Sequence, residues 1–146
     1  MDPLLKRVSI FAGLDEEALN VLTDHAQEII APPDTVIVRE GESGNKLFLI
    51  GAGSIRVWKH FGQPDAVQLA TLAPGDFFGE MCILETLPRA ATAQAATDSK
   101  LFRISSMAFL HLYEKKPAAY GILVLNIARD LSRRLRKLDE AFAARH

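Results

Sequence analysis

The spacing of apolar residues changes twice along the chain, from helical to strand-like and back to helical. Near both ends, apolar residues recur every three or four positions, as on a helix with one buried face. These ends predict a short helical turn at 3–8, a helix at about 15–27, a helix from Ser105 or Ser106 to about 113, and a long helix at about 117–143. Asp15 and the two serines have side chains suited to capping helix starts.

Between about residues 35 and 104, apolar residues alternate with polar ones or form short buried runs, as they do in strands. The strand candidates are 36–38, 47–50, 55–60, 67–71 and 101–104. Seven of the nine glycines lie between positions 41 and 79, where a series of tight turns would need them. The pattern predicts a mainly β fold, an antiparallel β-roll of the jelly-roll type, with an N-terminal helical segment and C-terminal helices.

The length of 146 residues fits one domain. We expect residues 1–116 to form the roll with its short helices, and residues 117–146 to form the long helix of the same domain. With 17 basic and 18 acidic residues, the composition gives no reason to expect a strongly charged partner. A local excess of basic residues at 129–145 is typical of a solvated helix face, so we do not expect nucleic acid as a partner.

Cys82 is the single cysteine, which excludes a disulfide within the chain and fits a reducing compartment. The charged N-terminus does not resemble a secretory signal, and no apolar run approaches the roughly 18 residues of a membrane span. We therefore expect a cytoplasmic protein without membrane contact. The four histidines are scattered and no serine or cysteine has the neighbours of a nucleophile, so we expect no metal, no cofactor and no catalytic residues.

The centre of the chain combines the residue types that would bind a phosphate attached to a sugar. Gly79 and Glu80 stand at the expected start of a short helix, where the amides of Gly79, Met81 and Cys82 would point at an anion. Arg89 would add a charge-assisted contact to the same phosphate. An ionised Glu80 only accepts hydrogen bonds, so a ribose hydroxyl is its natural partner. The alternative is that Glu80 and Arg89 form an ordinary surface ion pair.

Residues 78–92, FGEMCILETLPRAAT, resemble the phosphate-binding cassette of cyclic nucleotide-binding domains, such as those of the regulatory subunit of cyclic AMP-dependent kinase. A second match covers residues 37–53, IVREGESGNKLFLIGAG, which fits the glycine-turn-strand pattern of that family. The resemblance implies that Arg89 binds the cyclic phosphate and Glu80 the ribose 2′-hydroxyl. The implied ligand-binding set is Gly79, Glu80, Met81, Cys82, Arg89, Ala90 and Ala91, with Val57 and Leu69 as apolar walls for the ribose and base.

The family resemblance also bears on which nucleotide is bound. In cyclic GMP-selective relatives the residue after the arginine is often threonine, and here it is Ala90, which favours cyclic AMP and leaves cyclic GMP as the alternative. Cys82 departs from the family, which usually has alanine or another very small residue there. We expect the cysteine to be tolerated, because it is small and the backbone amide makes the contact. A redox-sensing role for Cys82 is the alternative to simple packing.

The long C-terminal helix is the expected output of the domain. At 1.5 Å per residue, a helix of about 27 residues spans roughly 40 Å, more than a domain of this size can cover. In the family this helix often dimerises or folds over the base as a lid, and Arg133, Arg134 and Leu138 are the candidate lid residues. The resemblance therefore implies a non-catalytic signalling module whose ligand repositions this helix, with a second copy or a partner protein on its free part.

Other functions remain open at this point. The same fold could serve as a protein–protein adaptor with an idle pocket, although the presence of both Glu80 and Arg89 speaks against it. A DNA-binding regulator of the catabolite activator type is the other alternative. Those proteins carry a helix-turn-helix domain after the long helix, whereas this sequence ends at His146. A cupin-type enzyme would need a histidine-rich metal site inside the roll.

Overall fold

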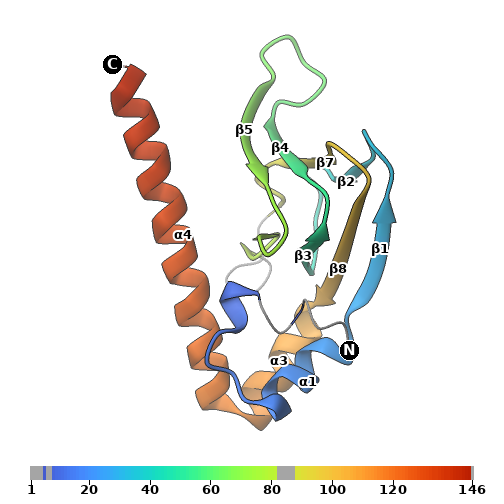
Figure 1. Cartoon of the computed structure of the whole chain (residues 1–146), viewed down its shortest axis with the longest axis vertical. Coiled ribbons are helices and arrows are strands. Elements are labelled where there is room, and N and C mark those ends of the chain that lie inside the picture. Colours follow the sequence, from blue (N-terminus) through green and yellow to red (C-terminus); the bar gives the residue numbers. More distant parts are fainter. Residues whose placement is uncertain (1–4, 6–7, 82–87, 146) are drawn as a thin grey trace.

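The computed structural model describes residue 5, residues 8–81 and residues 88–145 (Figure 1). The helical elements are η2 (Ser9–Phe11), α1 (Glu16–Thr23), α3 (Ser106–Lys115) and α4 (Pro117–Arg145). The strands are β1 (Gln27–Ala31), β2 (Val36–Val38), β3 (Lys46–Ala52), β4 (Ile55–Lys59), β5 (Val67–Leu72), β6 (Phe77–Phe78), β7 (Thr92–Ala95) and β8 (Ser99–Ser105). Along the sequence, helical elements come first and last and all eight of these strands lie between them, which confirms the predicted fold class.

The strands form two antiparallel four-stranded sheets. The first has the order β1-β8-β3-β6 and the second the order β2-β7-β4-β5. Strands that are distant in sequence are therefore neighbours: β1 pairs with β8, and β2 pairs with β7. This pairing closes the roll and brings the loop before β3 next to the start of β7.

The strand β3 is buried on both faces, which explains its unbroken apolar run. Leu47 and Leu49 pack with the helices, whereas Phe48 and Ile50 point to the other side, into the space between the two sheets. Alternate side chains of a strand point to opposite faces, so a strand between two cores must be apolar at every position. The roll therefore has one core between its sheets and a second core under its helices.

The helices cover the outer face of the first sheet, and α4 begins among them. Ala119, Leu123 and Ile127 of α4 are buried in the helical core. The side-chain amide of Asn126 donates to the backbone carbonyls of Ile10 and Ala12, at 2.9 and 2.8 Å. These contacts fix the first half of α4 against η2.

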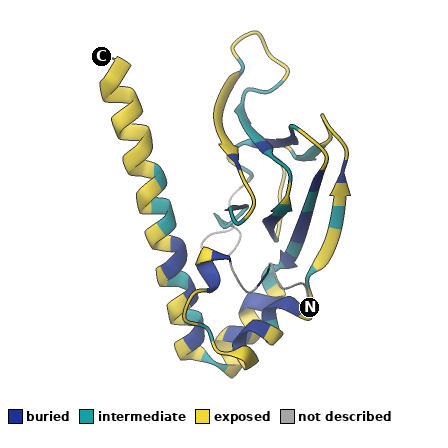
Figure 2. Cartoon of the chain, viewed as in Figure 1, coloured by how far each residue is buried: buried dark blue, intermediate teal, exposed yellow. Residues whose placement is uncertain are grey.

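The second half of α4 rises beside the roll without packing into its core (Figures 1 and 2). From position 133 to position 145, every residue except Arg134 is exposed. Three large apolar side chains stand in this half with more than half of their surface exposed: Leu135, Leu138 and Phe142.

The first predicted helix is shorter than expected. It starts as predicted, with the Asp15 side chain accepting from the amide of Ala18, but it ends at Thr23 instead of about residue 27. Gln27 already belongs to β1, a strand that the sequence analysis missed. In β1 only Ala31 is fully buried, so the strand shows neither an alternating nor a continuous apolar pattern. Its pairing with β8, rather than its own pattern, makes it a strand.

Two strands of the second sheet also differ from expectation. The predicted alternation at 67–71 does not correspond to a buried face, because every residue of β5 except Leu72 is exposed. The strand β5 is one of the two outer strands of its sheet, and Leu69, Ala70, Thr71 and Leu72 face the cavity described below. The strand β7, with the sequence TAQA, was missed because it is short and contains no large apolar residue, yet all four positions are buried.

Part of the predicted structure lies outside the described residues. Of the helical turn expected at 3–8, only Leu5 and Val8 are described, and both are buried. The helix expected after Gly79 is described only at Met81, which is helical. Across the described ranges, no helix combines the length and the apolar character that a membrane crossing requires.

Candidate functional site

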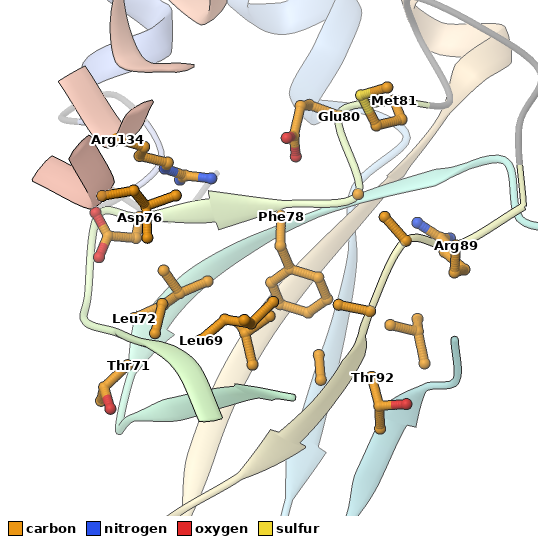
Figure 3. A pocket seen from close by; sticks show the side chains of 18 of the residues that line it. Leu69, Thr71, Leu72, Asp76, Phe78, Glu80, Met81, Arg89, Thr92 and Arg134 are labelled. Carbon is orange, nitrogen blue, oxygen red and sulfur yellow. The ribbon is translucent and has the colours of Figure 1, made fainter. Parts of the chain in front are cut away.

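A cavity of about 570 Å³ lies between the second sheet and the second half of α4. Ligand-binding pockets commonly have volumes of about 300–1,000 Å³, so it can hold a nucleotide-sized molecule. Its walls come from segments far apart in the sequence: the end of β2, the loop before β3, strands β4 and β5, residues 76–81, residues 88–93 and one side of α4. Figure 3 shows the ring of Phe78 in the middle of this space, with Leu69 and Leu72 on one side and Arg89 on the other.

Arg89 is held in place by its backbone and by its side chain. The amide of Arg89 donates to the carbonyl of Glu42, and its own carbonyl accepts from the amide of Gly41, both at 2.8 Å. Both terminal nitrogens of the guanidinium donate to the carbonyl of Lys46, each at 3.1 Å. Five N–H donors are present on a guanidinium, so this seat leaves donors for an anion in the cavity.

Two glycines make room for the Arg89 guanidinium. A Cβ atom at Gly44 would lie 2.3 Å from Nη2 of Arg89, and a Cβ atom at Gly79 would lie 2.5 Å from Nη1. Gly79 also has a φ of +83°, a conformation that side chains disfavour. The glycines of the two sequence motifs thus meet in space on either side of one arginine.

An aromatic stack lies beneath the arginine. The rings of Phe48 and Phe78 are stacked with their centroids 4.9 Å apart, and the Arg89 guanidinium carbon lies 5.7 Å from the centre of the Phe48 ring. Val57, Leu69 and Leu72 continue this apolar surface along the sheet. The cavity therefore has a cationic end and an apolar floor.

Glu80 lines the same cavity and is half-buried. It forms no ion pair with Arg89, although both residues belong to the described part of the chain. Arg89 contacts the Lys46 carbonyl instead, so the surface ion pair considered from the sequence is not formed. No described residue provides a hydrogen-bond partner for the Glu80 carboxylate, so its oxygens can accept bonds from a ligand.

The opposite wall of the cavity comes from α4, through Arg134, Lys137, Leu138 and Ala141. Nη2 of Arg134 donates to the Phe77 carbonyl at 2.7 Å, and its guanidinium lies 4.3 Å from the centre of the Phe77 ring. Of the three candidate lid residues, Arg134 and Leu138 line the cavity. Arg133 does not: it points to solvent and pairs with Asp130 at 2.9 Å.

The structure brings most of the predicted site residues together. The cavity is lined by Val57, Leu69, Gly79, Glu80, Met81, Arg89, Ala90 and Ala91, and Cys82 lies outside the described residues. The sequence analysis gave no site role to Gly44, Phe78 or Thr92, which also line it. All three residues belong to the two motifs, so the motifs included them but did not show which of their residues face the ligand cavity.

The described side chains of the site are mostly apolar, with a few charged groups among them. Within residues 5, 8–81 and 88–145, no group of three or more histidine, cysteine, aspartate or glutamate side chains is arranged to hold a metal ion. The groups at hand are the Arg89 guanidinium, the Glu80 carboxylate and an apolar floor, with Arg134 and Lys137 on the opposite wall. They suit a phosphorylated sugar with an attached base.

Comparison with known proteins identifies the family. The model of the cyclic nucleotide-binding domain matches residues 28–116, which is more than half of the chain. The chain belongs to the cyclic nucleotide-binding domain family. This domain is thus homologous to cyclic AMP-binding regulators, and the match includes both sequence motifs.

Two relatives are similar to this chain in sequence, and one solved structure is similar to it in fold. The cyclic AMP receptor protein of Thermus thermophilus is 32% identical over 136 residues, which cover 92% of this chain and 61% of that protein. The cAMP-dependent protein kinase regulatory subunit of Yarrowia lipolytica is 36% identical over 76% of this chain and 29% of its own length. The crystal structure of a cyclic nucleotide-binding domain from Methylobacillus flagellatus superposes with a TM-score of 0.84 at 22% identity, over 98% of this chain and 80% of that one.

This chain therefore spans less than two thirds of the length of both relatives. Both carry the names of regulatory proteins, a receptor and a kinase regulatory subunit. The third similarity, at low identity, concerns the fold alone.

Proposed function

We propose that this domain is a non-catalytic sensor of a cyclic nucleotide, with cyclic AMP preferred over cyclic GMP. The observation that carries the proposal is the seat of Arg89, which is built by two motif glycines and the Lys46 carbonyl at one end of an open cavity. The names of both relatives, which mention cyclic AMP, support the same ligand class. An open cavity also argues against the adaptor hypothesis, which would favour a side chain filling the pocket.

In the proposed complex, the cyclic phosphate lies against the Arg89 guanidinium and the amides around Cys82 and Ala90. The ribose 2′-hydroxyl donates to Glu80, whose carboxylate has no partner among the described residues. The base and ribose cover Val57 and Leu69. One cation for one phosphate and one acceptor for one hydroxyl match the charge and the hydrogen-bonding groups of the ligand.

The preference for cyclic AMP rests on Ala90. This position has no hydroxyl that could meet the amino group of guanine, whereas a threonine would provide one. Cyclic GMP can still enter the same phosphate and ribose subsites, so we expect weaker binding rather than exclusion.

We infer that α4 is the element that responds to the ligand. Arg134 and Leu138 reach the cavity from a helix half whose residues from 133 to 145 are exposed except for Arg134, which contacts Phe77. A ligand shifts this helix only if it binds the two arrangements with different affinities. The exposed Leu135, Leu138 and Phe142 support a second role for this half, contact with a second copy or a partner protein.

Titration of the purified protein with cyclic AMP and cyclic GMP by calorimetry tests the proposal. Replacing Arg89 by alanine removes the phosphate's cation, which should weaken cyclic AMP binding by about 2–5 kcal/mol, or roughly 30-fold to several thousand-fold. Arg103→Ala serves as the control, because Arg103 is a half-buried arginine on β8 that contacts Gln27 and does not line the cavity. Absence of binding by both nucleotides, or equal binding by the Arg89 variant, would refute the assignment.

A further inference from the structure

We propose that Lys59 and Glu40 act as a positioning pair that fixes the Ala90–Ala91 peptide, the second peptide after Arg89, for ligand binding. The inference rests on the proposed function, in which Arg89 and Ala90 hold the phosphate. Lys59 lies at the end of β4, Glu40 follows β2, and neither contributes to the cavity lining. Both therefore act through the backbone of Ala90 rather than by touching the ligand.

The contact to Ala90 is direct. Nζ of Lys59 donates to the Ala90 carbonyl at 2.9 Å and pairs with Oε2 of Glu40 at 3.1 Å. Ala90 and Ala91 both line the cavity, and their methyl groups are too small to anchor this corner themselves. The ammonium group of Lys59 supplies the anchor that these side chains lack.

Glu40 is itself held by two hydrogen bonds, and its carboxylate in turn orients the Lys59 ammonium group toward the Ala90 carbonyl. The backbone amide of Glu40 donates to the hydroxyl of Thr92 at 3.0 Å, and its carboxylate accepts from the amide of His60 at 3.0 Å. The hydrogen bond from His60, followed by that from Lys59, lowers the pKa of the Glu40 carboxyl from its ordinary value. The carboxylate therefore stays charged and binds the β4–β5 hairpin, while the backbone amide of Glu40 binds β7 through Thr92.

The peptide bond transmits this anchoring to the binding site. A peptide group is planar, so fixing the Ala90 oxygen also fixes the Ala91 amide in the same plane. The two peptides that flank Arg89 are held by Glu42 and Gly41. The Lys59 contact anchors the next peptide, Ala90–Ala91, so three consecutive peptides around the arginine are held.

The pair works through geometry rather than through its charge. The positive charge of Lys59 is compensated by Glu40 at 3.1 Å, so the pair adds little net field at the phosphate. The side chains are 43% and 28% exposed, and ion pairs of this kind contribute little to global stability. A loss of ligand affinity without a matching loss of stability is therefore the signature of the pair.

The test compares cyclic AMP binding by the unmodified protein, Lys59→Met, Lys59→Arg and Glu40→Gln. We expect Lys59→Met to bind about five- to tenfold more weakly, because it loses one charged hydrogen bond, and Glu40→Gln to change affinity in the same direction. Lys59→Arg, which keeps a cationic donor, should restore most of the affinity. Lys100→Met is the matched control, since Lys100 is a strand lysine that pairs with Glu28 at 3.7 Å, away from the cavity.

A second measurement separates positioning from general destabilisation. In ¹⁵N spectra of the ligand-free protein, the amide resonances of Ala90 and Ala91 should move in Lys59→Met and return in Lys59→Arg, while thermal unfolding matches that of Lys100→Met. Unchanged affinity together with unmoved Ala90 and Ala91 resonances in Lys59→Met overturns the inference, and so does an affinity loss that Lys100→Met shares. If the unmodified protein binds neither nucleotide, the proposed function fails, and the alanine resonances alone then support or overturn the positioning role.

Discussion

At the scale of single residues, the site depends on two positions that carry no side chain. Gly44 and Gly79 lie on either side of the Arg89 guanidinium, and a methyl group at either would enter its space. The two positions differ in their backbone: Gly79 has a positive φ, whereas no such value is found at Gly44. Steric and conformational effects on the arginine can therefore be separated by experiment.

We predict that Gly44→Ala weakens cyclic AMP binding by about tenfold or more, roughly 1.4 kcal/mol, because the new Cβ displaces Arg89 without straining the backbone. Gly79→Ala should show the same loss together with a stability decrease of about 1–2 kcal/mol from its left-handed backbone. Gly62→Ala is the control for the backbone effect, since Gly62 has a φ of +82° and nothing within 4 Å of its Cβ position. Urea unfolding and calorimetric titration measure the two quantities. Normal affinity in Gly44→Ala would show that Arg89 can move without loss.

Several residues of the site could be predicted from the sequence, but their contacts with one another could not. Arg89, Glu80 and the glycines could be named from the two motifs, because these residue types at these spacings are what the binding of a phosphate and a sugar requires. The contact of Gly44 with Arg89 joins positions 45 residues apart and follows from the folded arrangement only. Arg133 and Arg134 are neighbours on one helix, and periodicity alone could not decide which of them faces the cavity.

At the scale of elements, the junction of α3 and α4 is tied to the start of α1. Nζ of Lys116, in the residue between the two helices, donates to the Asp15 carboxylate and lies 3.5 Å from Oε2 of Glu17. Asp15 also caps α1 through the amide of Ala18. The hydrogen bond from Lys116, and after it the bond from Ala18, lowers the pKa of the Asp15 carboxyl, and the same contact raises the pKa of Lys116.

The lowered pKa of Asp15 has a defined consequence for stability. A carboxyl with a lower pKa in the folded state stabilises the protein above its unfolded value of 3.8, and this contribution is lost as the pH falls through the lower folded value. We predict that the unfolding free energy of Asp15→Asn declines less steeply with acid in this range than that of the unmodified protein. Asparagine keeps the capping oxygen, so the comparison isolates the charge. Urea unfolding at a series of pH values measures it, with Asp139→Asn on the exposed half of α4 as the control; parallel curves for Asp15→Asn and the unmodified protein would contradict the prediction.

The attachment of α4 gives a second prediction at this scale. Replacing Asn126 by leucine removes two hydrogen bonds and leaves the carbonyls of Ile10 and Ala12 without their donor. We expect a loss of roughly 1–3 kcal/mol in unfolding free energy, because an unsatisfied buried polar group costs about that much. Asn20→Ala, at an exposed position of α1, should change stability far less. Similar values for the two variants would mean that α4 is held by its apolar contacts alone.

A helix or strand could be predicted where its own sequence carried a clear pattern of apolar residues. The run Leu47–Ile50 and the long helix were recognised because burial on both faces, or on one stripe, leaves a continuous signal. The strands β1 and β7 were missed because partners define them: β1 is mostly exposed, and β7 is buried but built from small residues. The strand expected at 67–71 is confirmed as β5, although its alternation matches no buried face.

At the scale of the whole molecule, the first half of α4 belongs to the helical core and the second half lies along the cavity, where Arg134 contacts Phe77. Leu135, Leu138 and Phe142 are 60%, 55% and 67% exposed, and their spacing places them on one side of the helix. Large apolar side chains grouped in this way indicate an interaction surface. The same half contributes Arg134 and Leu138 to the ligand cavity, so association and ligand binding share one helix.

We predict that the 16.1 kDa chain self-associates through this surface. Replacing both Leu135 and Phe142 by arginine should abolish association, because two charges would have to be buried at the contact. Light scattering across a concentration series, with and without cyclic AMP, measures the mass. The double replacement of Arg129 and Arg136 by lysine, which keeps charge and length, is the control. A monomeric mass at every concentration would contradict the prediction and would mean that a different protein, rather than a second copy, covers this surface.

The reciprocal backbone bonds between Arg89 and the segment 41–42 limit how this family member can change its length. Two loops more than forty positions apart are joined atom to atom, so an inserted residue between Gly41 and Lys46 would shift the carbonyls on which Arg89 rests. An insertion at the exposed hairpin tip, next to Gly62, meets no such constraint. Library design or domain grafting on this scaffold can therefore vary the hairpin freely, but must carry the loop before β3 and the arginine segment as one unit.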